Sequence, residues 1–168
     1  MDVKLRPLFA MTKEAFCMVI APEHLLVSVL EWFVREDGVG LLCICGNFSR
    51  VLSRLDRCCP AFHVRRAFTA HQLLGILEEA ECRLIVLEHD PTLYDDAPDL
   101  ALPVALACAD RARNAPLFLL APRTDPALRR MARCAHRIVC VEQGEVPARR
   151  ASLRALLVRD QQTLDRGR

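Results

Sequence analysis

Short apolar runs alternate along this chain with longer segments whose apolar residues recur at helical spacing. Short runs bounded by turn residues are typical of strands buried on both faces, and a period of 3.6 residues is typical of amphipathic helices. The sequence predicts strands at residues 15–21, 39–45, 62–68, 83–90, 115–121 and 137–142, with helices at 23–35, 48–57, 70–80, 100–113 and 125–135. This alternation predicts an α/β fold with a doubly wound, mostly parallel sheet flanked by helices.

Residues at the ends of these segments support the predicted boundaries. Pro22 immediately precedes the first helix, where its missing amide costs little. Asn47 and Thr69 are suited to cap the helices that follow them, and Asp125 with Pro126 is typical of a helix start. After a turn the chain continues into 151–158, for which an antiparallel edge strand is favoured over a final helix.

The run at 83–90 is predicted to lie in the middle of the sheet. Its large apolar residues indicate burial on both faces, and it ends in Glu88 and Asp90. In open α/β sheets, ligands bind outside the carboxyl ends of the strands. Glu88 and Asp90 are therefore the candidate catalytic residues of this chain.

Length and composition indicate one globular domain. The chain has 168 residues, 52% of them hydrophobic. This suits a single domain spanning 1–168 with its core at about 15–158. No apolar stretch is long enough to cross a membrane, and the first residues do not resemble a signal peptide. We expect a cytoplasmic protein without a membrane partner.

The nine cysteines do not form a metal-binding pattern. No CxxC pair occurs, and the spacing of Cys43 and Cys45 or of Cys58 and Cys59 is not that of a zinc site. Most of the cysteines lie within or beside apolar segments, where a thiol acts as a small hydrophobe. We expect reduced thiols, no metal and no cofactor.

Charge is distributed unevenly along the chain. From Pro122 onward, 11 arginines face five acidic residues, a net charge of +6, which leaves 12 basic and 16 acidic residues before it. Such a basic block is suited to contact phosphates, although a solvated surface explains it equally well.

The order of these segments resembles the RecA-type recombinase ATPases, in particular the RadB and KaiC-like branch. The likeness covers about 15–158: a first strand and helix, a second strand, and a later apolar strand that ends in an acid. The run 83–90 stands in that later position, 64–74 resembles the peripheral strand and helix before it, and 136–142 resembles the closing core strand of the family. The resemblance implies a RecA-like domain.

The chain departs from this family where the phosphate loop should lie. ATP hydrolysis in the family needs G-x-x-x-x-G-K-[ST] between the first strand and helix. The glycines let backbone amides approach the phosphates, the lysine neutralises the phosphate charge, and the hydroxyl binds magnesium. Here the degenerate position reads Pro22, Glu23 and His24. The chain is therefore interpreted as a degenerate paralogue rather than an ATPase.

The resemblance implies a non-catalytic accessory protein of DNA recombination or repair. Its partner would be a recombinase-like protein or a second copy of the chain, together with DNA bound through its phosphates. The predicted DNA-binding residues are the arginines that follow the last strands, namely Arg123, Arg129, Arg130, Arg133, Arg149, Arg150 and Arg154. Arg129 and Arg133 are expected to share a helix face.

Two alternatives stay open. Residues 40–142 have the strand and helix rhythm of a response-regulator receiver, but that family needs acids where this chain has Cys45, Gly46 and Asn47. The segment 15–35 also has no place in a receiver. The second alternative is a weak nucleotide- or magnesium-binding enzyme that uses Glu88 and Asp90.

Overall fold

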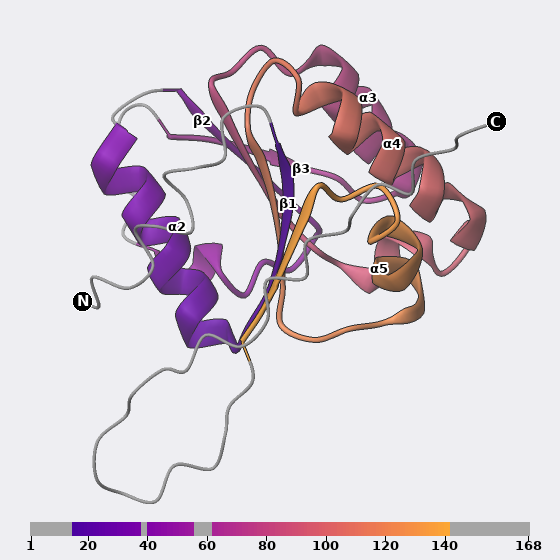
Figure 1. The fold of residues 1–168 in the computed structure, drawn as a ribbon, viewed down its shortest axis with the longest axis horizontal. Coiled ribbons are helices and arrows are strands. Elements are labelled where there is room, and N and C mark those ends of the chain that lie inside the picture. Colours follow the sequence, from indigo (N-terminus) through magenta and orange to yellow (C-terminus); the bar gives the residue numbers. More distant parts are fainter. Residues whose placement is uncertain (1–14, 38–39, 56–61, 142–168) are drawn as a thin grey trace, which may run out of the picture.

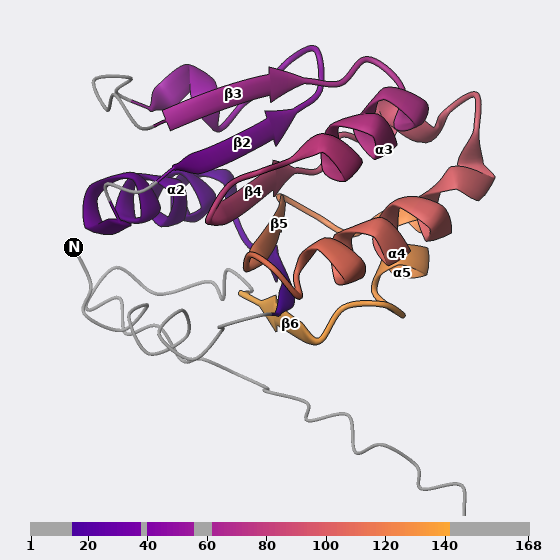
Figure 2. The ribbon, with the colours of Figure 1, turned by 90° about the horizontal axis from the view of Figure 1, so that it is seen from above.

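Six parallel strands form the sheet in the part of the chain that the structure describes. The structure, a computed structural model of the chain, describes residues 15–37, 40–55 and 62–141. Within them the strand order is β3-β2-β4-β5-β1-β6 (Figure 2). The strands are β1 (Phe16–Ile20), β2 (Leu41–Cys45), β3 (Phe62–Arg66), β4 (Leu84–Glu88), β5 (Leu117–Ala121) and β6 (Arg137–Cys140). The predicted α/β class is confirmed.

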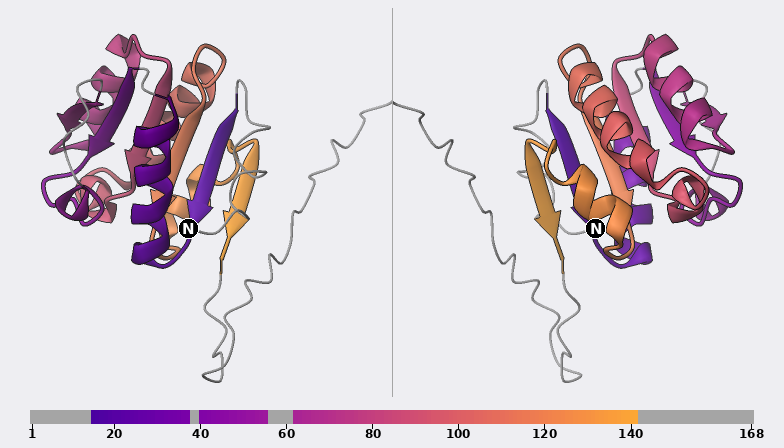
Figure 3. Two further views of the ribbon diagram at one scale, coloured as in Figure 1. Left: turned by 90° about the vertical axis from the view of Figure 1, so that its left-hand side faces the viewer. Right: turned by 90° about the vertical axis from the view of Figure 1, so that its right-hand side faces the viewer.

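Helices cover both faces of the sheet. The helices are α2 (Glu23–Asp37), α3 (Ala70–Glu79), α4 (Ala101–Arg111) and α5 (Pro126–Met131). Three short 3₁₀ turns accompany them: η1 (Leu52–Arg54), η2 (Pro91–Tyr94) and η3 (Pro98–Leu100). Figure 1 shows α2 on one side of the sheet and α3, α4 and α5 on the other. The two views of Figure 3 each face one of these layers.

The strands divide their side chains between two apolar clusters. In β4, Ile85 and Leu87 pack beneath α3 and α4, whereas Leu84 and Val86 face α2. All five residues of β4 are buried. Successive side chains of a strand point to opposite faces, and here both faces are covered. β4 lies between β2 and β5, so the predicted central position of this strand is confirmed.

The first strand of the chain lies inside the sheet. β1 pairs with β5 on one side and with β6 on the other, and Phe16 to Val19 are at most 3% exposed. His136 holds the start of β1 in place, because the Phe16 amide donates a hydrogen bond to His136 Nδ1 at 2.9 Å. The His136 amide in turn donates to the Phe16 carbonyl at 2.9 Å. β1 is thus an integral strand of the sheet and not an appendage.

Two of the predicted helix caps are present. The Thr69 side chain accepts a hydrogen bond from the Gln72 amide at the start of α3. The Asp125 side chain accepts one from the Leu128 amide at the start of α5, directly before Pro126. Each cap satisfies a backbone donor that the first turn of a helix leaves without a partner.

Two predicted helices are shorter than expected. The helix predicted at 48–57 is wrong: over 48–55, the part of it that the structure describes, only η1 forms, the Leu52 amide bonds to the Ser49 hydroxyl, and Leu55 returns to extended backbone. Helix α5 ends at Met131 and not at 135, because the Arg133 and Cys134 amides bond three residues back. The expected antiparallel strand at 151–158 lies outside the described residues, and every described strand is parallel.

The strand predicted at 137–142 is present as β6, but it is not the closing core strand that the resemblance implied for 136–142. In β6 three of the four residues are exposed, and β6 is the outermost strand at its end of the described sheet. β3 is outermost at the other end and carries exposed Arg65 and Arg66. Charged residues on outer strands discourage unwanted pairing with other chains.

Cys17, Cys43, Cys82, Cys108 and Cys134 are free thiols. No disulfide joins them, and Cys17, Cys43 and Cys108 are buried in the core. Burial raises the pKa of the Cys17 thiol to about 11. The cause is that apolar surroundings disfavour the charged thiolate. Among the described residues, no helix is both long and apolar enough to span a membrane.

We expect Phe118→Ala to lower the free energy of unfolding by about 3–5 kcal/mol, measured by urea denaturation. Phe118 in β5 is 1% exposed, and its ring lies 4.6 Å from that of Phe33 in α2 between centroids. The control is Phe68→Ala, which removes a ring that is 58% exposed. This control should change stability by at most about 0.5 kcal/mol. Equal losses in the two variants would contradict this account of the core.

Candidate functional site

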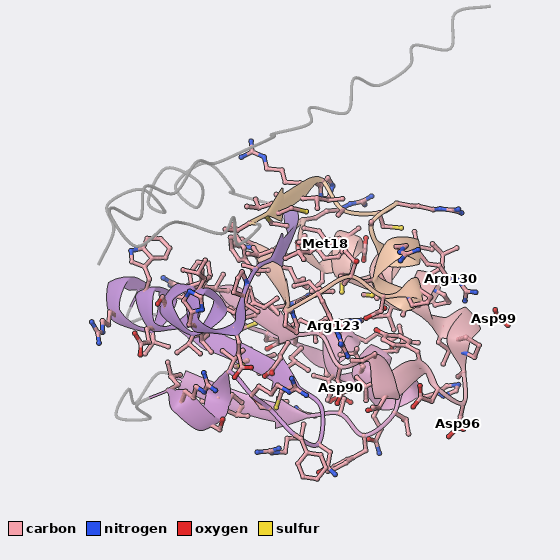
Figure 4. All side chains as sticks on the ribbon, turned by 90° about the horizontal axis from the view of Figure 1, so that it is seen from below. Met18, Asp90, Asp96, Asp99, Arg123 and Arg130 are labelled. Atoms are coloured by element: carbon pink, nitrogen blue, oxygen red, sulfur yellow. The ribbon has the colours of Figure 1, made fainter. Side chains whose placement is uncertain are left out.

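A cleft opens at the carboxyl ends of the strands. It has a volume of about 350 Å³ and lies between the loops that follow β1, β2, β4 and β5. From β2 the chain continues outward to β3, whereas from β4 it continues the opposite way to β5. A crevice forms where neighbouring strands send their connections apart, and such crevices are the usual ligand sites of α/β sheets. Figure 4 looks onto this end of the molecule.

Glu88, the last residue of β4, is bonded to the turn that follows β2. One carboxylate oxygen accepts from the Arg50 amide at 2.8 Å and from the Val51 amide at 3.3 Å. The other accepts from the Ser49 hydroxyl, which itself accepts from the Leu52 amide at 2.8 Å. Glu88 is only 8% exposed. These bonds satisfy a charge that would otherwise be costly to bury. In this arrangement Glu88 shapes the wall of the cleft.

Next to Glu88 in sequence, buried His89 pairs with half-buried Asp125. His89 Nε2 lies 2.5 Å from Asp125 Oδ2, and the His89 side chain is 2% exposed. The other oxygen of Asp125 caps α5, so its carboxylate joins the loop after β4 to the start of that helix. The His89 ring also stacks on Tyr94, with 6.0 Å between ring centroids. Burial raises the pKa of Tyr94 well above its usual range.

Asp90 is held against the loop after β2. Its Oδ1 accepts from the Thr92 amide at 3.0 Å and from the Thr92 hydroxyl at 2.7 Å. The rest of its side chain abuts Gly46, where a Cβ atom would lie 2.7 Å from Asp90 Cγ and 2.9 Å from Asp90 Cβ. Glycine is therefore needed at position 46 for this close approach.

The junction of β1 and α2 is as short as the sequence indicated. Only Ala21 and Pro22 separate the two elements, and the Pro22 carbonyl already accepts from the Leu25 amide at 2.9 Å. Glu23 lines the cleft and forms an ion pair with Arg54 at 3.0 Å, while His24 is exposed. Neither Pro22 nor Glu23 nor His24 forms a loop that could wrap a phosphate.

The predicted DNA-binding arginines lie in different places. Arg123 is exposed at the cleft. Arg130 instead donates to the Pro98 carbonyl at 2.7 Å and lies 3.9 Å from Asp99 (Figure 4). Arg129 and Arg133 are exposed, but α5 ends between them, so the expected shared helix face is wrong. Arg149, Arg150 and Arg154 lie outside the described residues.

The acidic segment after β4 does not form a metal site. Asp95, Asp96 and Asp99 are exposed in and around η2 and η3, as is usual for a solvated loop. Across the described part of the chain, no three His, Cys, Asp or Glu side chains converge as metal ligands.

Several of the site's contacts could not be foreseen from sequence spacing. Ser49 and Asp125 meet Glu88 and His89 across separations of 39 and 36 residues. The sequence offered one indirect signal, a glycine directly after the predicted strand 39–45. Such a glycine is typical of a position where another group approaches the backbone.

We expect Gly46→Ala to destabilise the fold by about 1–3 kcal/mol in urea denaturation, because the new methyl group overlaps Asp90. Gly75→Ala is the matched control, since a Cβ at Gly75 meets nothing within 4 Å. Alanine also favours a helix at that position. Asp90→Ala should partly relieve the defect, so the double variant should lose less stability than the sum of the single variants. Simple additivity would contradict the close approach.

We expect Glu88→Ala to lower the free energy of unfolding by about 2–4 kcal/mol, because buried donors then lose their acceptor. Those donors are the Arg50 and Val51 amides. Glu88→Gln keeps one acceptor oxygen and should lose less. Glu78→Ala, on the exposed side of α3, is the control and should be close to neutral. A stable Glu88→Ala variant would show that the carboxylate does not hold the turn.

Comparison with known proteins finds a partial relative. No family model matches the chain. Over 81 residues, 48% of this chain, the sequence is 46% identical to an uncharacterized protein of Archaeoglobus fulgidus. The match covers 40% of that protein's length, so the chain spans well under two thirds of its relative.

Proposed function

We propose that the protein is a non-catalytic RecA-like accessory protein of DNA recombination or repair, which contacts a partner protein and the DNA backbone. One observation carries this proposal. Glu88, the acid that ends β4, is bonded to the 49–51 turn, and at the same edge of the sheet the β1–α2 junction holds only Ala21 and Pro22.

The absence of ATPase chemistry follows from the needs of phosphoryl transfer. A triphosphate is held by backbone amides, a lysine and a hydroxyl on magnesium, and an acid serves the metal. At the β1–α2 junction Pro22 has no amide to donate, and Glu23, which is paired with Arg54, stands where the family has a lysine or a hydroxyl. The Glu88 carboxylate is buried, and it accepts hydrogen bonds from the Ser49 hydroxyl and from the Arg50 and Val51 amides instead of facing a metal.

The position of β1 favours a RecA-like domain over a receiver. Without β1 the sheet order is β3-β2-β4-β5-β6. This matches the order 2-1-3-4-5 of receivers and flavodoxins. The buried β1 is inserted between β5 and β6, where a receiver has no strand. In the RecA-like reading, the first strand and the strand that ends in the acid are near neighbours, and here only β5 separates β1 from β4.

The weak-enzyme alternative has less support. Asp90 accepts hydrogen bonds from Thr92, and Glu88 accepts them from the turn after β2. The two carboxylates are therefore not arranged around one metal position. Magnesium prefers several oxygen ligands in near-octahedral geometry. The described residues offer no group of three such ligands.

The DNA contact is proposed for exposed arginines near α5. Arg129 and Arg133 are exposed, and no hydrogen bond or ion pair of their side chains to another described residue is present. Arginines of this kind bind phosphates without reading base sequence. Arg130 contributes less, since the Pro98 carbonyl already binds it.

We expect the full chain to bind fluorescein-labelled DNA at low salt, measured by fluorescence anisotropy. Arg129→Gln with Arg133→Gln should weaken binding and reduce the slope of log K against log salt by about 2, since each arginine neutralises one phosphate. The control is Arg83→Gln, an exposed arginine that precedes β4 at the opposite edge of the sheet. It should leave both quantities unchanged.

Three results would decide against the proposal. Absence of DNA binding at low salt, together with failure to recover a recombinase by pull-down, would contradict the proposed accessory function. Magnesium-dependent ATP hydrolysis that disappears in folded Glu88→Gln would favour the enzyme alternative, whereas uptake of phosphate from acetyl phosphate on Asp90 would favour the receiver.

A further inference from the structure

We propose that the cleft at the carboxyl edge binds a small molecule that carries an oxyanion, a phosphate monoester or a carboxylate, beside a flat apolar part. Arg50 and Arg123 hold the oxyanion, and Phe48 covers the apolar part. This function is separate from the DNA contacts proposed above and does not depend on them.

The size and place of the cleft suit such a molecule. Its volume is about 350 Å³. This is within the range for small-molecule sites, which starts at roughly 300 Å³. The cleft lies where the connections leaving β2 and β4 diverge, with rigid strands on both sides of the opening. The hydrogen bonds of Glu88 and Asp90 fix its walls without any ligand.

The carboxylates that line the cleft already have partners. Glu23 pairs with Arg54, Glu88 binds the 49–51 turn, Asp90 binds Thr92, and Asp125 binds His89. The fold thus engages each of these carboxylates, Glu23 with an arginine and Glu88 and Asp90 with neutral amide and hydroxyl donors. Each of these four acids therefore has at least one partner among the described residues.

Unlike these acids, the two arginines of the cleft have guanidinium groups without a partner among the described residues. Arg50 and Arg123 both line it and are exposed, and neither guanidinium forms a hydrogen bond or ion pair with another described residue. A guanidinium offers a planar fork of donors that fits two oxygens of a phosphate or carboxylate. The two guanidinium groups are therefore the charged groups of the cleft without a partner among the described residues, and both are suited to an oxyanion.

Phe48 adds an apolar surface at the same opening. Its side chain is 85% exposed although it lines the cleft. The backbone just before it is held in place, because Arg66 Nη1 donates to the Asn47 carbonyl at 2.5 Å. An exposed aromatic ring beside two cations is suited to stack on a flat group attached to the oxyanion.

The test is isothermal titration of the full chain with phenyl phosphate, benzoate and inorganic phosphate at constant ionic strength. We expect saturable binding of at least one ring-bearing probe, and the stronger of the two identifies phosphate or carboxylate as the preferred oxyanion. Arg50→Gln and Arg123→Gln should each weaken that probe about tenfold, as expected for loss of a charge-assisted contact. Phe48→Ala should weaken the ring-bearing probe more than inorganic phosphate.

Matched controls separate this site from a general effect of positive charge. Arg83→Gln removes an exposed arginine at the opposite edge of the sheet and should bind the probe like the unaltered chain, as should Arg129→Gln with Arg133→Gln. Thermal unfolding checks that each variant is folded. No saturable binding of any probe, or equal weakening by Arg50→Gln and Arg83→Gln, would overturn the proposal, whatever the result with DNA.

Discussion

The buried carboxylate of Glu88 is the constraint on which the carboxyl edge of this molecule depends. A charge at the end of a central strand must be hydrogen-bonded. Here its partners come from the turn after β2. Those bonds draw residues 49–51 over the sheet and replace an expected helix with a single 3₁₀ turn. They also leave the exposed Arg50 beside the cleft. One acidic residue thereby determines the turn and the wall of the cleft.

The fold was readable from sequence because its signals are local. Burial of β4 and β5 follows from continuous apolar runs, and the caps at Thr69 and Asp125 act within three residues of their own positions. The failure at 48–57 has the same origin. Val51, Leu52 and Leu55 are all buried, but that spacing fits one tight turn as well as an α-helix, and only the distant Glu88 distinguishes them. Local pattern gives burial, while long-range polar contacts give the backbone conformation.

The candidate site was only partly readable for that reason. Glu88 and Asp90 lie at the carboxyl edge as the sequence predicted, since strand ends share an edge in a parallel sheet. Their surroundings could not be foreseen, because the approach of Asp90 to Gly46 depends on which strands are neighbours. The arginines divide similarly: Arg123 lines the cleft, whereas Arg130 serves the contact of α5 with η3. Composition alone treats all of them as one basic block.

The insertion of β1 between β5 and β6 also bears on how the chain folds. Phe16 in β1 pairs with Leu117 in β5, so β1 cannot complete its pairing until β5 is present. β6 can join the sheet only after β1 is in place. Contacts between residues so far apart in sequence are slow to form. During synthesis on the ribosome, the apolar first strand emerges long before its neighbours, and exposed apolar segments of this kind are prone to aggregate. Because β1 precedes β5 in the chain, it has no partner strand in the sheet until β5 has been synthesised.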